Sequence, residues 1–322
     1  MKVLLTGGTG FIGSHLAEAL TASGHEVYAL VRDPGTLKFL KGIPIRLVPG
    51  GLLDAPAFPP GLDRVFHLAG LTKALKTEAY FSVNRFGTAS LLETLAAQGQ
   101  FPRLIHLSSM AAAGPSIGGR PRREDDPPAP VSPYGRSKLA GEAEVLARAD
   151  RFPSVIIRVG AVYGPRDEEF ARFFRILKRG ILPCFGPGRQ PISICYVKDL
   201  VRALILAGEA GVRSGEIFQV GNPDASSFEE IGRLAALHLG RRARRLRIPM
   251  AAVKAAARLS DARSRRTGRA SLINRPKVAE LEQTGWEADV GKARAELGFE
   301  TTYSLDAGLA ETLDWCLAQG RI

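Results

Sequence analysis

The sequence predicts an α/β fold in which a doubly wound parallel sheet is joined to a smaller, mostly helical C-terminal lobe. Apolar runs of strand length alternate with stretches of helical period through the first half of the chain, and a glycine-rich turn directly follows the first run. Parallel strands need crossover connections, so this alternation is typical of βαβ units whose sheet is covered on both faces. The loops at the carboxyl ends of such strands are expected to form the functional site.

Most of the expected sheet lies in the first half of the chain. Strands are expected at 2–6, 26–31, 44–48, 63–68, 103–108 and 154–159, with helices near 11–23, 77–98 and 134–149 between them. Beyond Pro165 the pattern becomes irregular. Helices are expected near 168–179, 199–209, 227–239, 251–262, 289–297 and 305–318, and returns to the sheet around 192–197 and 216–221. This predicts a first domain of residues 1–165 with returning segments near 192–222, and an interleaved lobe of residues 166–322.

The composition is that of a soluble globular protein: 322 residues, of which 45% are hydrophobic and 24% charged. No apolar run reaches the length of about 18 residues that a membrane span needs, so no stable membrane insertion is expected. Met1 leads directly into the first strand, which predicts no secretory signal and a cytoplasmic protein. The three cysteines lack the spacing of metal or C-x-x-C sites, and no metal is expected.

The net charge of +12 is concentrated in one segment. Residues 241–277 hold 13 Arg and Lys against the single acid Asp261, which accounts for the whole excess. A protein that coats nucleic acid would more often carry a basic face across its fold, so no nucleic-acid partner is expected. The first interpretation is a solvated Arg-rich surface, and an anionic substrate, a membrane surface or a protein partner stay open as alternatives.

A glycine-rich turn, residues 7–13, stands between the first strand and the first helix. Glycines let the backbone turn tightly and approach a phosphate, while the helix offers free N–H groups and its positive dipole end. About 120 residues later, Tyr134 and Lys138 stand one helical turn apart, and Ser108-Ser109 end an intervening strand. Each motif alone is a weak signal.

Together, in this order, the motifs resemble the extended short-chain dehydrogenase/reductase superfamily, with its NAD-dependent epimerase/dehydratase, 3β-hydroxysteroid dehydrogenase and dihydroflavonol-reductase-like branches. The resemblance runs through nearly the full length. It implies a Rossmann-type sheet, a dinucleotide-binding domain in residues 1–165 and a substrate-binding lobe in residues 166–322. Residues 67–70 (His-Leu-Ala-Gly) resemble the segment beside the adenosine half of the cofactor, and Asn84 matches the V-N-x-x-G-T helix. The residues so implied to hold the cofactor are Thr6, Gly7, Thr9, Gly10, Phe11, Ile12, Gly13, Arg32, Leu68, Ala69, Gly70, Asn84, Tyr134 and Lys138.

The end of the second strand favours NADP(H) over NAD(H). NAD enzymes usually place an acid there for the ribose hydroxyls, whereas the 2′-phosphate of NADP needs a cation. Here Val31 stands at the acid position and Arg32 follows, whose planar fork of donors suits a phosphate. Asp33 stays open as an alternative ribose ligand. Gly51 departs from the pattern, because relatives usually carry an Asp there to bind the adenine.

The resemblance assigns catalysis to Ser109, Tyr134 and Lys138. Tyr134 is implied to move the proton, Ser109 to donate a hydrogen bond to the substrate oxygen, and Lys138 to hold the nicotinamide ribose. An unperturbed Tyr has a pKa near 10, so we expect the neighbouring ammonium of Lys138 to lower the pKa of Tyr134.

The substrate is not readable from the sequence, but two departures bear on its class. Nucleotide-sugar epimerases commonly carry Asn where Ala161 stands and Arg where Ile192 stands, both for phosphate contacts. Their loss favours a neutral or less phosphorylated substrate, with Arg189 as a nearby substitute. The first hypothesis is an NAD(P)-dependent oxidoreductase acting at a secondary alcohol or ketone. The alternatives are a nucleotide-sugar epimerase or dehydratase and a non-catalytic cofactor-sensing protein. A small-molecule substrate is the expected partner, and a homodimer is left open.

Overall fold

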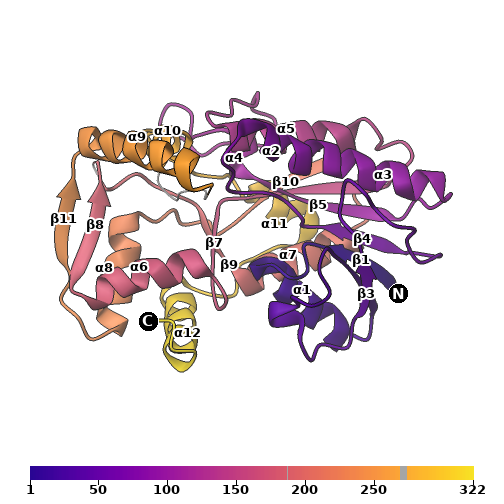
Figure 1. Cartoon of the computed structure of the whole chain (residues 1–322), viewed down its shortest axis with the longest axis horizontal. Coiled ribbons are helices and arrows are strands. Elements are labelled where there is room, and N and C mark those ends of the chain that lie inside the picture. The colour runs from indigo at the N-terminus through magenta and orange to yellow at the C-terminus, as the bar shows by residue number, and fades with distance from the viewer. Residues whose placement is uncertain (187, 269–273) are drawn as a thin grey trace.

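A seven-stranded parallel sheet forms the centre of the computed structural model, which describes residues 1–186, 188–268 and 274–322 (Figure 1). The strands follow the order β10-β6-β5-β4-β1-β2-β3, and all neighbours run parallel. Their bounds are β1 Lys2–Thr6, β2 Glu26–Val31, β3 Arg46–Pro49, β4 Arg64–His67, β5 Arg103–Ser109, β6 Ser154–Val159 and β10 Glu216–Val220. The predicted Rossmann-type α/β class is therefore confirmed, with each expected strand of the first half within two residues of its place.

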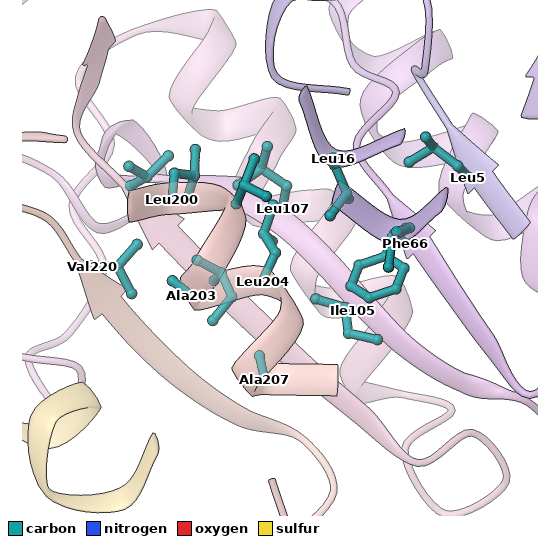
Figure 2. Packing of buried hydrophobic residues seen from close by; sticks show 14 of the residues in the cluster. Leu5, Leu16, Phe66, Ile105, Leu107, Leu200, Ala203, Leu204, Ala207 and Val220 are labelled. Atoms are coloured by element: carbon teal, nitrogen blue, oxygen red, sulfur yellow. The ribbon is translucent and has the colours of Figure 1, made fainter. Parts of the chain in front are cut away.

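Helices cover both faces of this sheet. One face carries α1 (Phe11–Ala22), α7 (Val197–Glu209) and α11 (Gly291–Leu297), and the other carries α3 (Gly87–Ala97) and α5 (Pro133–Leu146). Successive strand residues point to opposite faces, so Leu4 packs under α3 while Leu5 packs under α1. Figure 2 shows the α7 side, where Leu204 lies against Ile105 of β5. Such fully buried leucines each contribute about 2–5 kcal/mol relative to alanine.

The helix expected at 77–98 is interrupted. α2 (Thr77–Phe81) passes into a π-helical segment at Ser82–Phe86 before α3 begins. A π-helical turn contains one more residue than an α-helical turn, and such bulges are frequent at functional sites. The buried residues at this junction, Asn84, Gly87 and Thr88, carry no apolar pattern from which the bulge could be predicted.

The second half of the chain builds two small parallel sheets outside the central one. β7 (Ala161–Tyr163) pairs with β9 (Ile194–Tyr196), and β8 (Ile181–Phe185) pairs with β11 (Arg244–Ile248). The expected return to the central sheet at 192–197 is therefore wrong, because β9 has β7 as its partner, while the return at 216–221 is confirmed as β10. β7, β8 and β11 were not predicted.

The helices of this half agree with the sequence pattern, with one addition. They are α6 (Glu168–Lys178), α8 (Phe228–His238), α9 (Met250–Thr267), α10 (Arg275–Leu281) and α12 (Leu305–Ala318), and the short α4 (Met110–Ala113) precedes them. α10 was not predicted. Tyr163, Phe174 and Leu309 belong to a second apolar cluster that joins β7, α6 and α12. No helix within the described ranges is long and apolar enough to cross a membrane. The division into two domains stays a prediction.

Candidate active site

The glycine-rich turn between β1 and α1 has the geometry that a pyrophosphate requires. Gly7 has a φ of +75°, and a Cβ there would lie 2.7 Å from the backbone N of Ala69. A Cβ on Gly13 would lie 2.2 Å from the carbonyl oxygen of Gly7. Gly10 caps α1 without a side-chain hydrogen bond, which leaves the first N–H groups of the helix available to an anion. Glycine is therefore required at positions 7 and 13, because the turn packs directly against the backbone of residues 68 and 69 and against the first turn of α1.

Thr6 and His67 join the ends of β1 and β4 beside this turn. The Thr6 Oγ1 and His67 Nδ1 atoms are 2.7 Å apart, and the backbone N of Ala69 donates to Thr6 Oγ1 at 3.2 Å. The other ring nitrogen of His67 lies 2.9 Å from Thr88 Oγ1 on α3. Burial, together with the nearby ammonium of Lys138, lowers the pKa of His67 to about 3. His67 is therefore a neutral structural link that fixes the 68–70 segment against Gly7.

Asn84, in the π-helical segment, connects the loop after β4 to α5. Its Oδ1 accepts from the backbone N of Leu71 at 2.7 Å, and its Nδ2 donates to the carbonyl of Leu71 at 3.0 Å and to Ser137 Oγ at 2.8 Å. A Cβ on Gly70 would lie 3.2 Å from Asn84 Oδ1 and 3.9 Å from Lys138 Nζ. The predicted cofactor residues Gly70, Asn84 and Lys138 therefore meet at one place.

Ser109, Tyr134 and Lys138 come together from β5 and α5. Ser109 ends β5, where its Oγ accepts from the backbone N of Ala111 at 3.1 Å. Tyr134 is the second residue of α5, whose start is fixed by Pro133 and by the Ser132 Oγ cap on Gly135 N at 3.0 Å. Burial raises the pKa of Tyr134 to about 12, and a hydrogen bond with Ser109 opposes the increase.

This finding corrects the expectation that the Lys138 ammonium lowers the pKa of Tyr134. Lys138 Nζ instead donates to the carbonyl of Leu107 at 2.7 Å. Burial lowers the pKa of Lys138 to about 8, and the carboxylate of Glu142 opposes the decrease. Desolvation thus dominates at both groups, because the helix face that carries them is packed onto the sheet.

Tyr80 and Glu280 also lie near Tyr134, and sequence reasoning missed both. The rings of Tyr80 and Tyr134 are 6.2 Å apart between centroids, and the Tyr80 hydroxyl accepts from the backbone N of Ala74 at 3.1 Å. The Glu280 carboxylate, on α10, acts to raise the pKa of both tyrosines. Glu280 is about 140 residues away from Tyr134 in sequence, so this electrostatic influence is long-range. Such long-range neighbours leave no signal in local sequence.

A buried ion pair lies one helical turn beyond Lys138. Arg158 on β6 donates to Glu142 from Nε at 3.0 Å and from an Nη at 2.7 Å, and Ser108 donates to the same carboxylate. The exposed fractions of the two charged side chains are 2% and 1%. Tyr134, Lys138 and Glu142 are spaced four residues apart on α5, so they share one face of the helix. The pair fixes that face to the sheet.

At the end of β2, Arg32 is exposed and forms no ion pair with the described residues. The carboxylate of Asp33 is already used, because it accepts from Gly35 N at 2.9 Å and from Thr36 Oγ1 at 2.6 Å. Gly51 lacks a side chain, but a Cβ there would lie 2.4 Å from Asp54 Oδ1. Asp54 therefore places a carboxylate over the position where relatives carry Asp.

The substrate-side residues are only partly where the sequence placed them. Ala161 is exposed on β7, as a contact position would be. Ile192 is buried in the apolar cluster of Tyr163 and Phe174, so its side chain has a packing role. Arg189, the expected substitute, is exposed, and its Nε lies 3.7 Å from Glu229 Oε2. Only the departure at Ala161 therefore bears on the substrate.

Neither of two hollows on the described surface contains a predicted catalytic residue. The larger, of about 590 Å³, is lined around Glu216 and Lys292 at the start of β10, and the smaller, of about 270 Å³, around Glu229 and Arg245. Within residues 1–186, 188–268 and 274–322, no group of His, Cys, Asp and Glu could hold a metal ion.

Comparison with known proteins gives matches over the whole chain. Residues 3–221 match the model of the NAD-dependent epimerase/dehydratase family. The ceramide reductase of Caulobacter vibrioides is 31% identical, over 99% of this chain and 95% of the relative. The 4-hydroxy-2-methyl-3-oxo-4-farnesyl-3,4-dihydroquinoline-1-oxide ketoreductase of Stigmatella aurantiaca is 28% identical, over 96% and 95%. The crystal structure of a Bacillus cereus UDP-glucuronic acid 4-epimerase in complex with NAD is 27% identical, covers 99% of each chain and has a TM-score of 0.79.

Proposed function

Because the chain belongs to the NAD-dependent epimerase/dehydratase family, we propose that it is an NAD(P)-dependent oxidoreductase that reduces a ketone to a secondary alcohol. The observation that supports this most is the placement of Ser109 and Tyr134, in which the phenol keeps its proton at neutral pH. A neutral phenol is the form that gives a proton to a ketone oxygen. The bound nicotinamide supplies the hydride to the carbon.

The side chains of the site have distinct roles in this proposal. The Ser109 hydroxyl donates a hydrogen bond to the ketone oxygen, and the Tyr134 hydroxyl transfers its proton to the same oxygen. Lys138, one helical turn further along α5, would hold the nicotinamide ribose. Its hydrogen bond to Leu107 fixes the ammonium beneath the site. Gly7, Gly10 and Gly13 would hold the pyrophosphate at the start of α1.

We propose NADP(H) as the preferred cofactor. The support is the free guanidinium of Arg32 and the engagement of Asp33 with its own turn, which removes the acid that would hold the ribose of NAD. The Asp54 carboxylate over Gly51 would take the adenine contact.

The substrate we propose is an apolar ketone. The names of the two relatives described above refer to a ceramide and to a farnesyl-substituted quinoline. Both compounds carry long apolar chains. The exposed Ala161 offers no hydrogen bond to a diphosphate. A nucleotide-sugar epimerase is the second candidate, favoured by the structural likeness to the UDP-glucuronic acid 4-epimerase.

The test follows NADPH oxidation with a panel of apolar ketones and UDP-sugars. We expect oxidation with an apolar ketone, and Tyr134→Phe to reduce the rate by at least about a hundredfold while cofactor binding is kept. Tyr28→Phe is the matched control, since its hydroxyl donates to Glu26, the first residue of β2, at the end of the sheet opposite to Ser109, which ends β5. Interconversion of UDP-sugars without net oxidation of cofactor would establish the epimerase instead.

A further inference from the structure

β11 and α9, in the strongly basic segment after α8, lie at the end of the molecule far from β1 (Figure 1), and most of their side chains are exposed. β11 and α9 follow each other along the chain, with only Pro249 between them. We call basic face a set of their exposed side chains, which consists of Arg244 and Leu246 on one face of β11 and of Arg258, Leu259, Arg263 and Arg266 on α9. From this face we infer that the protein docks on the surface of an anionic lipid bilayer.

The first support is charge that the protein itself leaves unpaired. Four cations of the segment pair with acids: Arg245 with Glu229, Lys254 with Glu282, Arg275 with Asp261 and Lys277 with Glu280. The arginines of the basic face form no ion pair with the described residues. Clustered cations on one face attract an anionic surface, with about a fivefold gain in affinity for each.

The second support is the apolar side chains between these cations. Leu259 is 74% exposed on α9, with Arg258 beside it and Arg263 one turn further on. Leu246 is 52% exposed on β11, on the same face of the strand as Arg244. Transfer of a leucine side chain from water into the boundary between lipid headgroups and acyl chains is favourable, whereas its exposure to water stabilises nothing.

The same pattern argues against a nucleic acid as the occupant. Proteins that bind single strands interleave cations with aromatic rings on which bases stack. Residues 241–277 contain no Phe, Tyr or Trp. Aliphatic side chains among arginines fit a lipid headgroup layer with acyl chains below it.

The third support is position. α9 packs on α10 through Val253, Ala257 and Val278, and Lys254 pairs with Glu282 just after α10. α10 in turn carries Glu280, whose carboxylate acts on Tyr134. The proposed docking face is therefore packed against α10, which carries a carboxylate that acts electrostatically on Tyr134. If the proposed reduction of an apolar ketone holds, a bilayer would deliver that substrate next to the site.

The experiment measures co-sedimentation of the full chain with vesicles of phosphatidylcholine alone and with added phosphatidylglycerol. We expect binding only to the anionic vesicles, weakened by salt. Arg258→Glu with Arg263→Glu should reduce the partition coefficient at least about 25-fold, and Leu259→Ser several-fold with the salt dependence kept. The matched control is Lys41→Glu with Arg151→Glu, which makes the same change of net charge on exposed residues around the central sheet.

The inference is overturned by equal binding to both kinds of vesicle or to neither, by a loss in the control as large as in the Arg258/Arg263 variant, or by tighter binding to duplex or single-stranded oligonucleotides than to anionic vesicles. All substituted side chains are exposed, and the thermal unfolding midpoint checks the fold of each variant. Vesicle binding needs no turnover, so failure here leaves the proposed reductase activity to its own test.

Discussion

Removal of the Glu142 carboxylate should destabilise the protein strongly, while removal of both partners of its ion pair should not. Glu142→Leu leaves the Arg158 guanidinium buried without its two charge-assisted hydrogen bonds. An unpaired buried charge costs about 3–5 kcal/mol, whereas replacing both charges with apolar side chains of similar volume is often close to neutral. We therefore expect a loss of about 3–5 kcal/mol for Glu142→Leu and substantial recovery in Glu142→Leu/Arg158→Met.

Urea unfolding of the wild type, both single variants and the double variant measures the coupling between Glu142 and Arg158. The free energies of unfolding are compared where the dependence on urea concentration, the m-value, is the same. Thr94→Ala on the exposed side of α3 is a control in which one helix-surface hydrogen bond is lost. A loss below about 1 kcal/mol for Glu142→Leu, or a double variant as unstable as the sum of the singles, would refute the reasoning.

The remaining predictions concern the cofactor, pH and nucleotide binding. Arg32→Ala should erase a preference for NADPH of about ten- to a hundredfold while leaving NADH affinity unchanged, and equal dissociation constants in the wild type would contradict this. The folded-state pKa of Lys138, about 8, is below its unfolded value, so its burial cost is relieved as pH rises from about 8 to 10.5. The free energy of unfolding of the wild type should therefore increase over that range relative to that of Lys138→Met. Parallel plots of the two free energies against pH would contradict this prediction. UDP and GDP should bind more weakly than about 1 mM by calorimetry, because Ala161 offers no partner to a diphosphate; a micromolar constant would favour the epimerase.

Much of the fold was predictable because its signals are local. The apolar runs of β1 to β6 and the glycine-rich turn predict a parallel α/β sheet of the Rossmann type. The superfamily resemblance is confirmed by the family match. β11 was missed because its Arg-rich sequence has no apolar period. It pairs with β8 at the surface, where burial does not constrain side chains.

The sequence predicts which residues of the candidate site lie close together better than it predicts their pKa values. The spacing of Tyr134 and Lys138 predicts a shared helix face, but the depth of their burial depends on packing against β5 and against Tyr80 of α2. Ile192 shows the same limit, since only the structure reveals that it points into the apolar core. The assigned roles of Ser109, Tyr134 and Lys138 stay predictions until they are tested.

The π-helical segment Ser82–Phe86 has a consequence for tolerance to deletion. Removal of one residue would let α2 and α3 join as one regular α-helix, yet it would rotate everything on one side by about 100° relative to the other. Thr88 would then turn away from His67, or Asn84 away from Leu71. The carbonyl of Asn84 also faces Gly141, where a Cβ would lie 2.3 Å away. The length of this segment is therefore as constrained as its sequence: a shortened chain with a better helix would lose the alignment of the loop after β4 with α5.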